Sequence, residues 1–269
     1  MFLRRGAGSD PQPVEIRDSD GPAVEVADVE VLRGSRVALR DVGFAIDPGT
    51  LTAVVGPNGA GKSSLFGALS GRLKPRRGTI RLAGPVAEVL QTTDIDEQLR
   101  MTVNDVVRLG RFPARGLIRP MRTHDRDVVD QALALTGMRD LRHRPINELS
   151  GGQRQRALVA QGLAQQASVL LLDEPTAGLD RRSKRQLMEI VRAEVARGTT
   201  VLFATHDLDE AAEADNLIVM ACECVCCAPP ITAMADPAVT ALFGPAPRWS
   251  WRDTPTAAQE PADVAAPVA

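Results

Sequence analysis

One glycine-rich loop constrains the fold of this chain more than any other feature of its sequence. Residues 51–55 form a short, largely apolar run that is typical of a buried strand, and residues 63–73 follow with helical periodicity. Between them lies Gly-Pro-Asn-Gly-Ala-Gly-Lys-Ser, which fits the pattern G-x-x-x-x-G-K-[ST] in the strand–loop–helix context that this pattern requires. We therefore expect an α/β fold in which the first helix begins at a phosphate-binding loop.

The residues of this loop supply complementary contacts to phosphate. Glycines allow backbone N–H groups to point inward at phosphate oxygens, and the N-terminus of the following helix adds positive potential. Lys62 is expected to reach the β and γ phosphates, and the Ser63 hydroxyl to ligate Mg²⁺. An incidental lysine in a glycine-rich turn is the alternative, which the position between strand and helix disfavours. The predicted nucleotide-binding residues are Gly56, Pro57, Asn58, Gly59, Ala60, Gly61, Lys62, Ser63 and Ser64.

Two carboxylates end a second expected strand. Residues 169–172 are Val-Leu-Leu-Leu, a buried-strand pattern, and Asp173 and Glu174 follow directly. In α/β folds ligands bind at the carboxyl ends of the parallel strands, so this pair is expected beside the phosphate loop. Asp173 would hold Mg²⁺ through its hydration shell, and Glu174 would orient and deprotonate an attacking water. The structural alternative is an acidic pair that caps the next helix.

Residues 149–153, Leu-Ser-Gly-Gly-Gln, precede an expected helix over about 154–166 and allow two interpretations. Ser150 and Gln153 fit a capping box, which would be a purely structural helix start. Two consecutive glycines, however, cost about 1 kcal/mol each inside a helix relative to alanine, and a simple cap does not need them. Gly151 and Gly152 would instead leave N–H groups exposed for a second phosphate site, which suggests that another copy of the chain supplies the other half of the nucleotide site.

Composition and charge narrow the class of protein. The chain has 269 residues, with 32 Lys and Arg against 34 Asp and Glu, and the net charge of −2 argues against binding nucleic acid through bulk charge. No apolar run approaches the length of a membrane helix, and the first residues lack the apolar core of a secretion signal. Strand-like runs alternate with helical patterns after a β-rich start, which predicts a mostly parallel sheet covered by helices. We expect a folded domain over 23–244 with a helical insert at about 92–148, and disordered tails over 1–22 and 245–269.

The order of these motifs points to a family. The phosphate loop, the Leu-Ser-Gly-Gly-Gln segment and the strand ending in Asp-Glu make the chain resemble the ATP-binding subunit of ABC transporters over about residues 24–244. The resemblance implies the ABC ATPase fold, a P-loop NTPase core with an N-terminal antiparallel β region. It matches Gln91 to the glutamine that touches Mg²⁺ and the γ-phosphate, residues 177–180 to the D-loop, and His206 to the switch histidine. The implied catalytic residues are Glu174, His206 and Gln91, and the implied Mg²⁺ ligands are Ser63, Gln91 and Asp173.

The resemblance also implies cofactors and partners. ATP and Mg²⁺ would bind between two copies that pair head to tail, with residues 56–63 of one protomer facing residues 150–153 of the other. This homodimer would dock at the cytoplasmic face of the cell membrane on integral-membrane permease subunits, to which an extracytoplasmic solute-binding protein delivers the substrate. ATP binding and hydrolysis would drive translocation, and the permease would seat in a groove along the helical insert.

The identity of the substrate rests on similarity in linker segments. Residues 101–107, 110–111, 144–146 and 242–244 resemble those of zinc or manganese importers, and next those of importers of iron siderophores, haem or cobalamin. A soluble ABC-type ATPase acting on ribosomes or DNA is the alternative from another class. Such proteins usually carry two ATPase units or a long coiled coil, and the net charge of −2 gives no footprint for a phosphate backbone.

The chain departs from the family pattern at two places. The family usually has an aromatic residue before the phosphate loop that stacks on adenine, but this chain aligns Arg33 there and contains no Tyr. Arg33 could stack its planar guanidinium on the base or could simply be an exposed turn residue. Gln161 and Gly162 replace a common Arg-Ala pair, and the glycine is expected to loosen its helix.

All four cysteines fall within one short segment that is expected to form a hairpin. Cys222, Cys224, Cys226 and Cys227 could suggest a zinc site. Ligands of one Zn²⁺ must converge at about 2.3 Å, whereas residues two apart on a strand are separated by about 6.6 Å and adjacent residues face opposite ways. The spacing therefore favours small buried or edge residues over a metal site.

Overall fold

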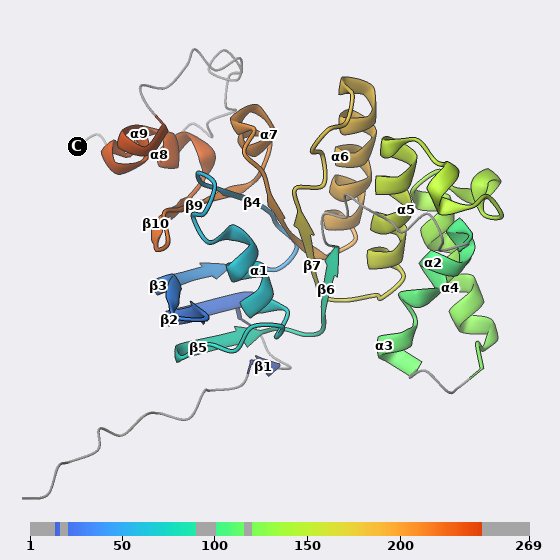
Figure 1. Ribbon diagram of the computed structural model, residues 1–269, viewed down its shortest axis with the longest axis horizontal. Helices are drawn as coiled ribbons and strands as arrows, with labels where there is room; N and C mark the ends of the chain where they lie inside the picture. Colours follow the sequence, from blue (N-terminus) through green and yellow to red (C-terminus); the bar gives the residue numbers. More distant parts are fainter. Residues whose placement is uncertain (1–13, 17–20, 90–100, 116–119, 244–269) are drawn as a thin grey trace, which may run out of the picture.

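The computed structural model describes residues 14–16, 21–89, 101–115 and 120–243. Its strands form a four-stranded sheet with the order β1-β5-β2-β3 and a six-stranded sheet with the order β10-β9-β4-β8-β7-β6 (Figure 1). Helix α1 (Lys62–Leu69) packs between the two sheets, and further helices cover the other face of the larger sheet (Figure 1). This is the α/β architecture that the alternating sequence pattern predicts.

The smaller sheet is mainly antiparallel. β2 (Val24–Arg33) pairs with β3 (Arg36–Ile46) on one side and with β5 (Arg77–Leu82) on the other. β1 (Glu15–Ile16) joins the edge of the sheet parallel to β5, and the Glu15 carboxylate lies 3.2 Å from Arg81 Nε. The prediction of a structureless tail over 1–22 is therefore not met at these two residues, because strand pairing and an ion pair hold them.

The larger sheet is parallel except at one edge. β4 (Leu51–Val55), β6 (Val86–Val89), β7 (Val169–Asp173), β8 (Thr200–Ala204) and β9 (Asn216–Met220) run in the same direction, and β10 (Cys224–Ala228) pairs antiparallel with β9. Every residue of β4 is buried, as a central strand covered on both faces requires. The carboxyl ends of β4, β7 and β8 consequently meet at one edge of the sheet, where the predicted site residues follow them.

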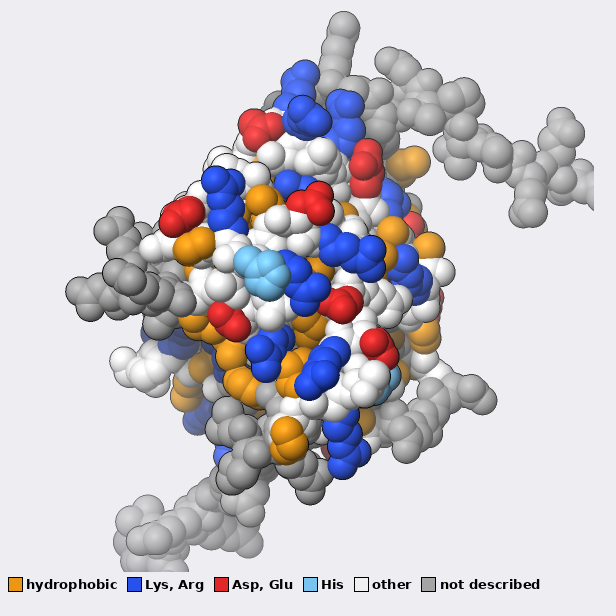
Figure 2. Space-filling model, turned by 90° about the vertical axis from the view of Figure 1, so that its right-hand side faces the viewer, with side chains coloured by type: hydrophobic (Ala, Val, Ile, Leu, Met, Phe, Trp, Pro, Cys, Tyr) orange, Lys and Arg blue, Asp and Glu red, His pale blue; other side chains and the backbone are white. Residues whose placement is uncertain are grey.

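The helices of the insert form a separate group, at the right of Figure 1. α2 (Val103–Leu109) and α4 (Thr123–Leu135) pack on α5 (Gly151–Leu163), which returns the chain to the sheet, and the short α3 (Phe112–Arg115) follows α2. The face on this side carries basic, acidic and apolar side chains interspersed (Figure 2). In the described residues, none of the helices has the length and apolar character needed to cross a membrane.

The remaining elements complete the core on the α5 side of the sheet. α6 (Arg181–Val195) and α7 (Leu208–Ala212) follow β7 and β8, and α8 (Pro230–Ala235) and α9 (Pro237–Phe243) follow β10. Two single-turn 3₁₀ helices, Arg139–Leu141 and Ile146–Glu148, connect α4 to α5. The buried apolar residues of the described chain extend from Ala23 to Val239.

Two predicted helices have different bounds in the structure. The helix expected over about 154–166 begins at Gly151 and ends at Leu163, because Ser150 caps it. The helix expected over 63–73 ends at Leu69, where a turn at Gly71 follows.

Candidate nucleotide-binding site

A cavity of about 290 Å³ opens at the carboxyl end of β4. The phosphate loop and the first residues of α1 form one part of its wall, Glu174 forms another, and the β2–β3 hairpin forms the rest. The lining residues are Arg33, Arg36, Val37, Ala38, Asn58, Gly59, Ala60, Gly61, Lys62, Ser63, Ser64 and Glu174. Seven of the nine residues predicted to bind nucleotide thus line one cavity together with the predicted base.

The curl of the loop depends on glycine at its last turn. Gly61, the N-cap of α1, has a φ of 98°, in the left-handed region that favours glycine. A Cβ at this position would lie 2.8 Å from the carbonyl oxygen of Ala38 and 2.7 Å from a methyl group of Leu39. β3 therefore packs directly against the start of α1, and only a residue without a side chain fits between them.

Lys62 extends back along the loop. Its Nζ donates hydrogen bonds to the carbonyl oxygens of Gly56, at 2.7 Å, and Pro57, at 3.3 Å, and the residue is 7% exposed. In the part of the chain that the structure describes, no carboxylate lies within ion-pair distance of this ammonium. Asp173 is near enough to act on this charge electrostatically but does not form an ion pair with it, so the ammonium can pair with a phosphate group.

Asp173, the last residue of β7, reaches the phosphate loop. The nearby Ser63 hydroxyl acts on the pKa of this carboxylate, so two of the predicted Mg²⁺ ligands are neighbours. Burial raises the pKa of Asp173, and the nearby carboxylates of Glu174 and Glu88 raise it further, against the opposing effects of Ser63 and Lys62. A divalent cation would offset this accumulation of negative charge, and a hydroxyl with a carboxylate is a donor set that Mg²⁺ accepts. The residues present therefore fit a magnesium ion bound together with phosphate.

Glu174 and His206 face each other at the ends of β7 and β8. The Nδ1 atom of His206 lies 3.8 Å from a carboxylate oxygen of Glu174, and the two side chains are 67% and 23% exposed respectively. Glu174 has a φ of 46°, although its N–H still donates to the carbonyl of Ala204. Backbone strain of this kind is uncommon for a residue with a side chain and is concentrated at functional sites.

A buried polar network behind these two residues was not identified from the sequence. The Glu210 carboxylate on α7 accepts hydrogen bonds from the hydroxyls of Thr176, at 2.6 Å, and Thr205, at 2.9 Å, and from Lys184 Nζ, at 2.7 Å. Thr176 follows Glu174 by two residues and Thr205 directly precedes His206. The network therefore ties together the two loops that carry the predicted catalytic pair. Its members have no motif spacing, so only their contacts in the fold reveal them.

Residues 150–153 lie outside the lining of this cavity. The capping box is present: the Gln153 N–H donates to the Ser150 hydroxyl at 3.3 Å, and the Ser150 N–H donates to the Gln153 side chain at 3.0 Å. A Cβ on Gly152 would lie 2.6 Å from the Ser183 hydroxyl, whereas a Cβ on Gly151 would meet nothing closer than 3.9 Å. Close packing of α6 therefore gives Gly152 a structural reason to be glycine, separate from the capping box and not anticipated from the sequence.

Three other predicted positions have different outcomes. Gln91 lies outside the described residues. In the D-loop segment 177–180, Asp180 caps α6, and its hydrogen bonds, above all with Ser183, lower the pKa of Asp180. Gly162 does not loosen its helix but permits close packing, since a Cβ there would lie 2.6 Å from a methyl group of Val89.

The cysteines form the predicted hairpin, with its turn at residues 221–223 between β9 and β10. Burial raises the pKa of Cys224 to about 12, so this thiol is protonated at neutral pH. Among the described residues there is no cluster of three or more His, Cys, Asp or Glu side chains able to hold a metal ion.

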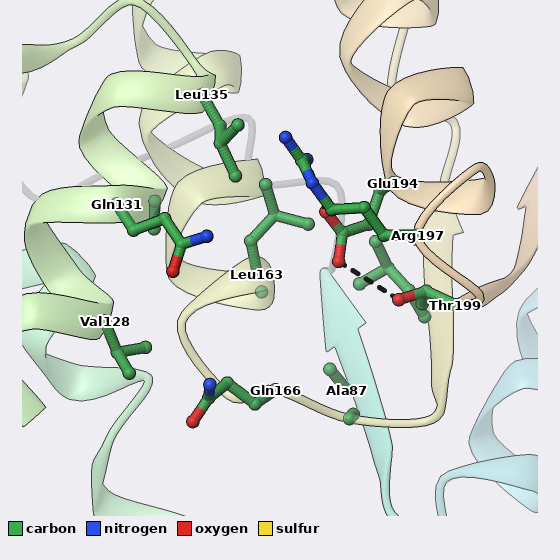
Figure 3. Close-up of a pocket in the computed structure, with 13 residues that line it drawn as sticks. Ala87, Val128, Gln131, Leu135, Leu163, Gln166, Glu194, Arg197 and Thr199 are labelled. Carbon is green, nitrogen blue, oxygen red and sulfur yellow. Dashed lines mark hydrogen bonds and ion pairs between the residues drawn. The ribbon is translucent and has the colours of Figure 1, made fainter. Parts of the chain in front are cut away.

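A second cavity, of about 270 Å³, lies between α4, α5 and the end of α6 (Figure 3). Gln131, Leu135 and Leu163 project into it, and Glu194 accepts a hydrogen bond from the Thr199 hydroxyl at 3.0 Å at its margin (Figure 3). The cavity is lined by the beginning of β7 and the segment before β8, away from the carboxyl ends of the strands. None of the predicted nucleotide or catalytic residues that the structure describes lines it.

Comparison with known proteins agrees with this geometry. Residues 39–177 match the ABC transporter family. The chain is 39% identical over 184 residues to a manganese transport system ATP-binding protein of Synechocystis sp., covering 65% of this chain and 71% of that protein. It is 42% identical over 207 residues to a cobalamin import ATP-binding protein of Halobacterium salinarum, covering 72% of this chain and 51% of that protein.

A similar fold occurs in solved structures. The inward-facing structure of a metal-chelate type ABC transporter aligns with a TM-score of 0.76 and 27% sequence identity, and the alignment covers 82% of this chain and 89% of that one. The family and the fold expected from the motifs are therefore both confirmed. The match over residues 39–177 and the relatives at more than 30% identity show that this chain belongs to the ABC transporter family, as one of its ATP-hydrolysing, ATP-binding proteins.

Proposed function

We propose that the chain binds ATP with Mg²⁺ in the cavity at residues 56–64 and that Glu174 is the base for hydrolysis. The observation that carries this proposal is the meeting of three strand ends. Asp173 lies near the Ser63 hydroxyl, which acts on its pKa, and a carboxylate oxygen of Glu174 lies 3.8 Å from His206 Nδ1. Groups that can hold a metal, accept a proton from water and donate to a phosphate therefore share one edge of the sheet.

Each side chain has a specific task in this scheme. Lys62 and the N–H groups of the loop hold the β and γ phosphates, and Ser63 with Asp173 positions Mg²⁺, which neutralises phosphate charge when bound. Glu174 accepts a proton from the attacking water. His206 donates to the γ-phosphate and keeps the Glu174 carboxylate aimed at that water, and Gln91 would complete the site from the insert.

The catalytic step can be tested with Glu174→Gln, measured in the subunit assembled with its permease. The amide keeps the shape of the side chain but cannot accept a proton, so hydrolysis should fall by about a hundredfold or more while ATP binding is retained. The matched control is Glu213→Gln, which makes the same chemical change at an exposed position just beyond α7 and should leave the rate unchanged. Near-normal turnover of Glu174→Gln would show that another group is the base.

We further propose that residues 150–153 serve the ATP of a second copy. Their N–H groups begin a long helix, and they do not line the cavity of their own chain. Ser150→Arg should then leave nucleotide binding by one chain intact but block closure of the dimer. Mixed with wild-type chains in the assembled transporter, this variant should depress the ATPase rate more than dilution alone. A strictly linear dilution curve would show that each chain works by itself and that the capping box is the whole role of Ser150.

The transport role follows from the family. We propose that the dimer powers uptake through separate permease subunits and that the substrate is a divalent transition metal ion such as manganese or zinc. The manganese transport relative supports this choice, together with the metal-chelate transporter structure. The cobalamin import relative favours a second candidate, a cobalamin or iron-chelate importer, because its identity over the aligned residues is slightly higher.

Transport by reconstituted permease and ATPase distinguishes these substrates. ATP-dependent uptake of radioactive manganese into vesicles, competed by zinc but not by cobalamin or an iron siderophore, would support the first candidate. Uptake of cobalamin or the siderophore with no uptake of manganese would replace it with the second. The Glu174→Gln subunit provides the control for uptake that does not depend on hydrolysis.

A further inference from the structure

The β2–β3 hairpin forms the end of the nucleotide cavity that is farther from the phosphate loop. The carbonyl of Ala38 is the part of β3 that packs against Gly61. From there the strand leads through Val37 to Arg36, and two residues of strand span about 6.6 Å. Arg33 and Arg36 line the same cavity, so the base of a nucleotide whose phosphates occupy the loop would lie against them.

Two guanidinium groups lie opposite each other at this end. Arg33 and Arg36 are register partners across the tip of the hairpin, and both are exposed. Among the described residues, neither side chain has a hydrogen-bonding or ion-pair partner. Like charges directly opposite one another on paired strands are destabilising, so the hairpin gains nothing from this arrangement by itself. A bound ligand that accepts hydrogen bonds from both guanidinium groups would offset their repulsion.

The cavity offers the base no aromatic face within the described residues. Phe44, Phe66 and Phe203 are buried in the core, at 8%, 0% and 0% exposure, and Phe112 and Phe243 lie in α3 and α9. The chain has no Tyr. Among the described residues that line this end of the cavity, the guanidinium groups are the planar groups that can stack on the base, and their N–H groups can donate hydrogen bonds to it.

A guanidinium group donates hydrogen bonds and accepts none. Guanine presents two acceptors, N7 and O6, on one edge, whereas adenine presents the N7 acceptor next to the N6 amino donor. A site formed by Arg33 and Arg36 can satisfy both groups of guanine but only one of adenine. We propose that these two arginines bind the base and that the chain therefore binds GTP at least as tightly as ATP, an inference that rests on the proposed nucleotide site.

The test compares dissociation constants of three ligands for the purified full chain in the presence of Mg²⁺. ATP and GTP share their phosphates, and inorganic tripolyphosphate reports the phosphate end alone. The variant Arg33→Gln/Arg36→Gln should weaken GTP binding by about fivefold or more, the low end expected for loss of a two-acceptor contact. ATP binding should change less, and tripolyphosphate binding should not change. The matched control is Arg40→Gln, which alters an exposed arginine of β3 that does not line the cavity.

The outcomes separate this inference from the function on which it rests. A wild-type chain that binds ATP more tightly than GTP would overturn it. An equal loss of all three ligands in the double variant would also overturn it, because the arginines would then act only by attracting negative charge. Lys62→Ala should weaken all three ligands. If Lys62→Ala leaves them unchanged, the proposed nucleotide site itself is wrong, whatever the arginine variants do.

Discussion

Replacing Glu210 with alanine would break the network behind the predicted catalytic pair. One carboxylate oxygen of Glu210 accepts from both Thr176 and Thr205, and the other accepts from Lys184. Both threonines are almost fully buried, at 3% and 2% exposure. Lys184 keeps a second partner in Asp207, at 3.2 Å, and its side chain is partly exposed. Removal of the carboxylate would thus leave two buried hydroxyls without their acceptor.

The magnitude follows from these contacts. Each buried hydroxyl that loses its partner costs about 1 to 2 kcal/mol, and rotation toward another acceptor or entry of water keeps the cost near the low end. The lost ion pair with Lys184 adds less than about 1 kcal/mol, because that ammonium is solvated and still paired. We expect Glu210→Ala to lower the free energy of unfolding by about 3 kcal/mol, a large part of the 5 to 15 kcal/mol typical of a domain.

Urea unfolding followed by circular dichroism measures this change. Glu213→Ala, an exposed glutamate just beyond the same helix, provides the control and should stay within about 0.5 kcal/mol of the wild type. Thr176→Val keeps the shape of the side chain but removes one hydroxyl, so it should cost about 1 kcal/mol. The order Glu210→Ala, then Thr176→Val, then Glu213→Ala is the signature of the network.

The ATPase rate gives a second measurement. The network joins the loops of Glu174 and His206, so Glu210→Ala should lower kcat at a temperature where the variant is still folded, with little change in KM for ATP. Glu210→Gln should recover part of the rate, since its amide oxygen still accepts from the threonines. If Glu210→Ala matches Glu213→Ala in both stability and kcat, the network neither stabilises the fold nor positions the pair.

Three other results are expected. Because burial raises the pKa of Asp173, this group favours folding most at low pH, and the effect is lost as the pH rises through its folded pKa. Asp173→Asn should therefore unfold at a higher urea concentration than the wild type at pH 7, and the difference should shrink toward pH 4. A variant less stable than the wild type at pH 7 would contradict this. Gly162→Ala should lower the free energy of unfolding by about 1 to 2 kcal/mol despite the better helix propensity of alanine, because the new Cβ meets Val89. Val89→Ala in the same chain should recover part of the lost stability. Additive effects of the two substitutions would exclude that contact. Burial raises the pKa of Cys224 to about 12, so this thiol should react with iodoacetamide at pH 8 much more slowly than a free thiol. Mass spectrometry of the labelled peptide measures the rate, and rapid labelling would show that the thiol is not buried.

The sequence predicts best the features whose chemistry is contained in a short segment. The phosphate loop, the acidic pair after β7 and the capping box at Ser150 each consist of residues that act together within a few positions of one another. Strand-length apolar runs also identify β4, β7 and β8 correctly, because a central parallel strand must be apolar on both faces. Boundaries are less certain from sequence, since a cap such as Ser150 moves the start of a helix by several residues.

Only the tertiary structure decides contacts between segments that are distant in the chain. Thr176 and Glu210 are 34 residues apart and Lys184 and Glu210 are 26 apart, and no sequence period links them. The need for glycine at positions 152 and 162 likewise depends on Ser183 and Val89, which other elements bring close. Local sequence determines which groups can bind phosphate or accept a proton. The packing of β7, β8, α6 and α7 determines which of these groups meet, because burial of their apolar faces fixes the distances between their ends.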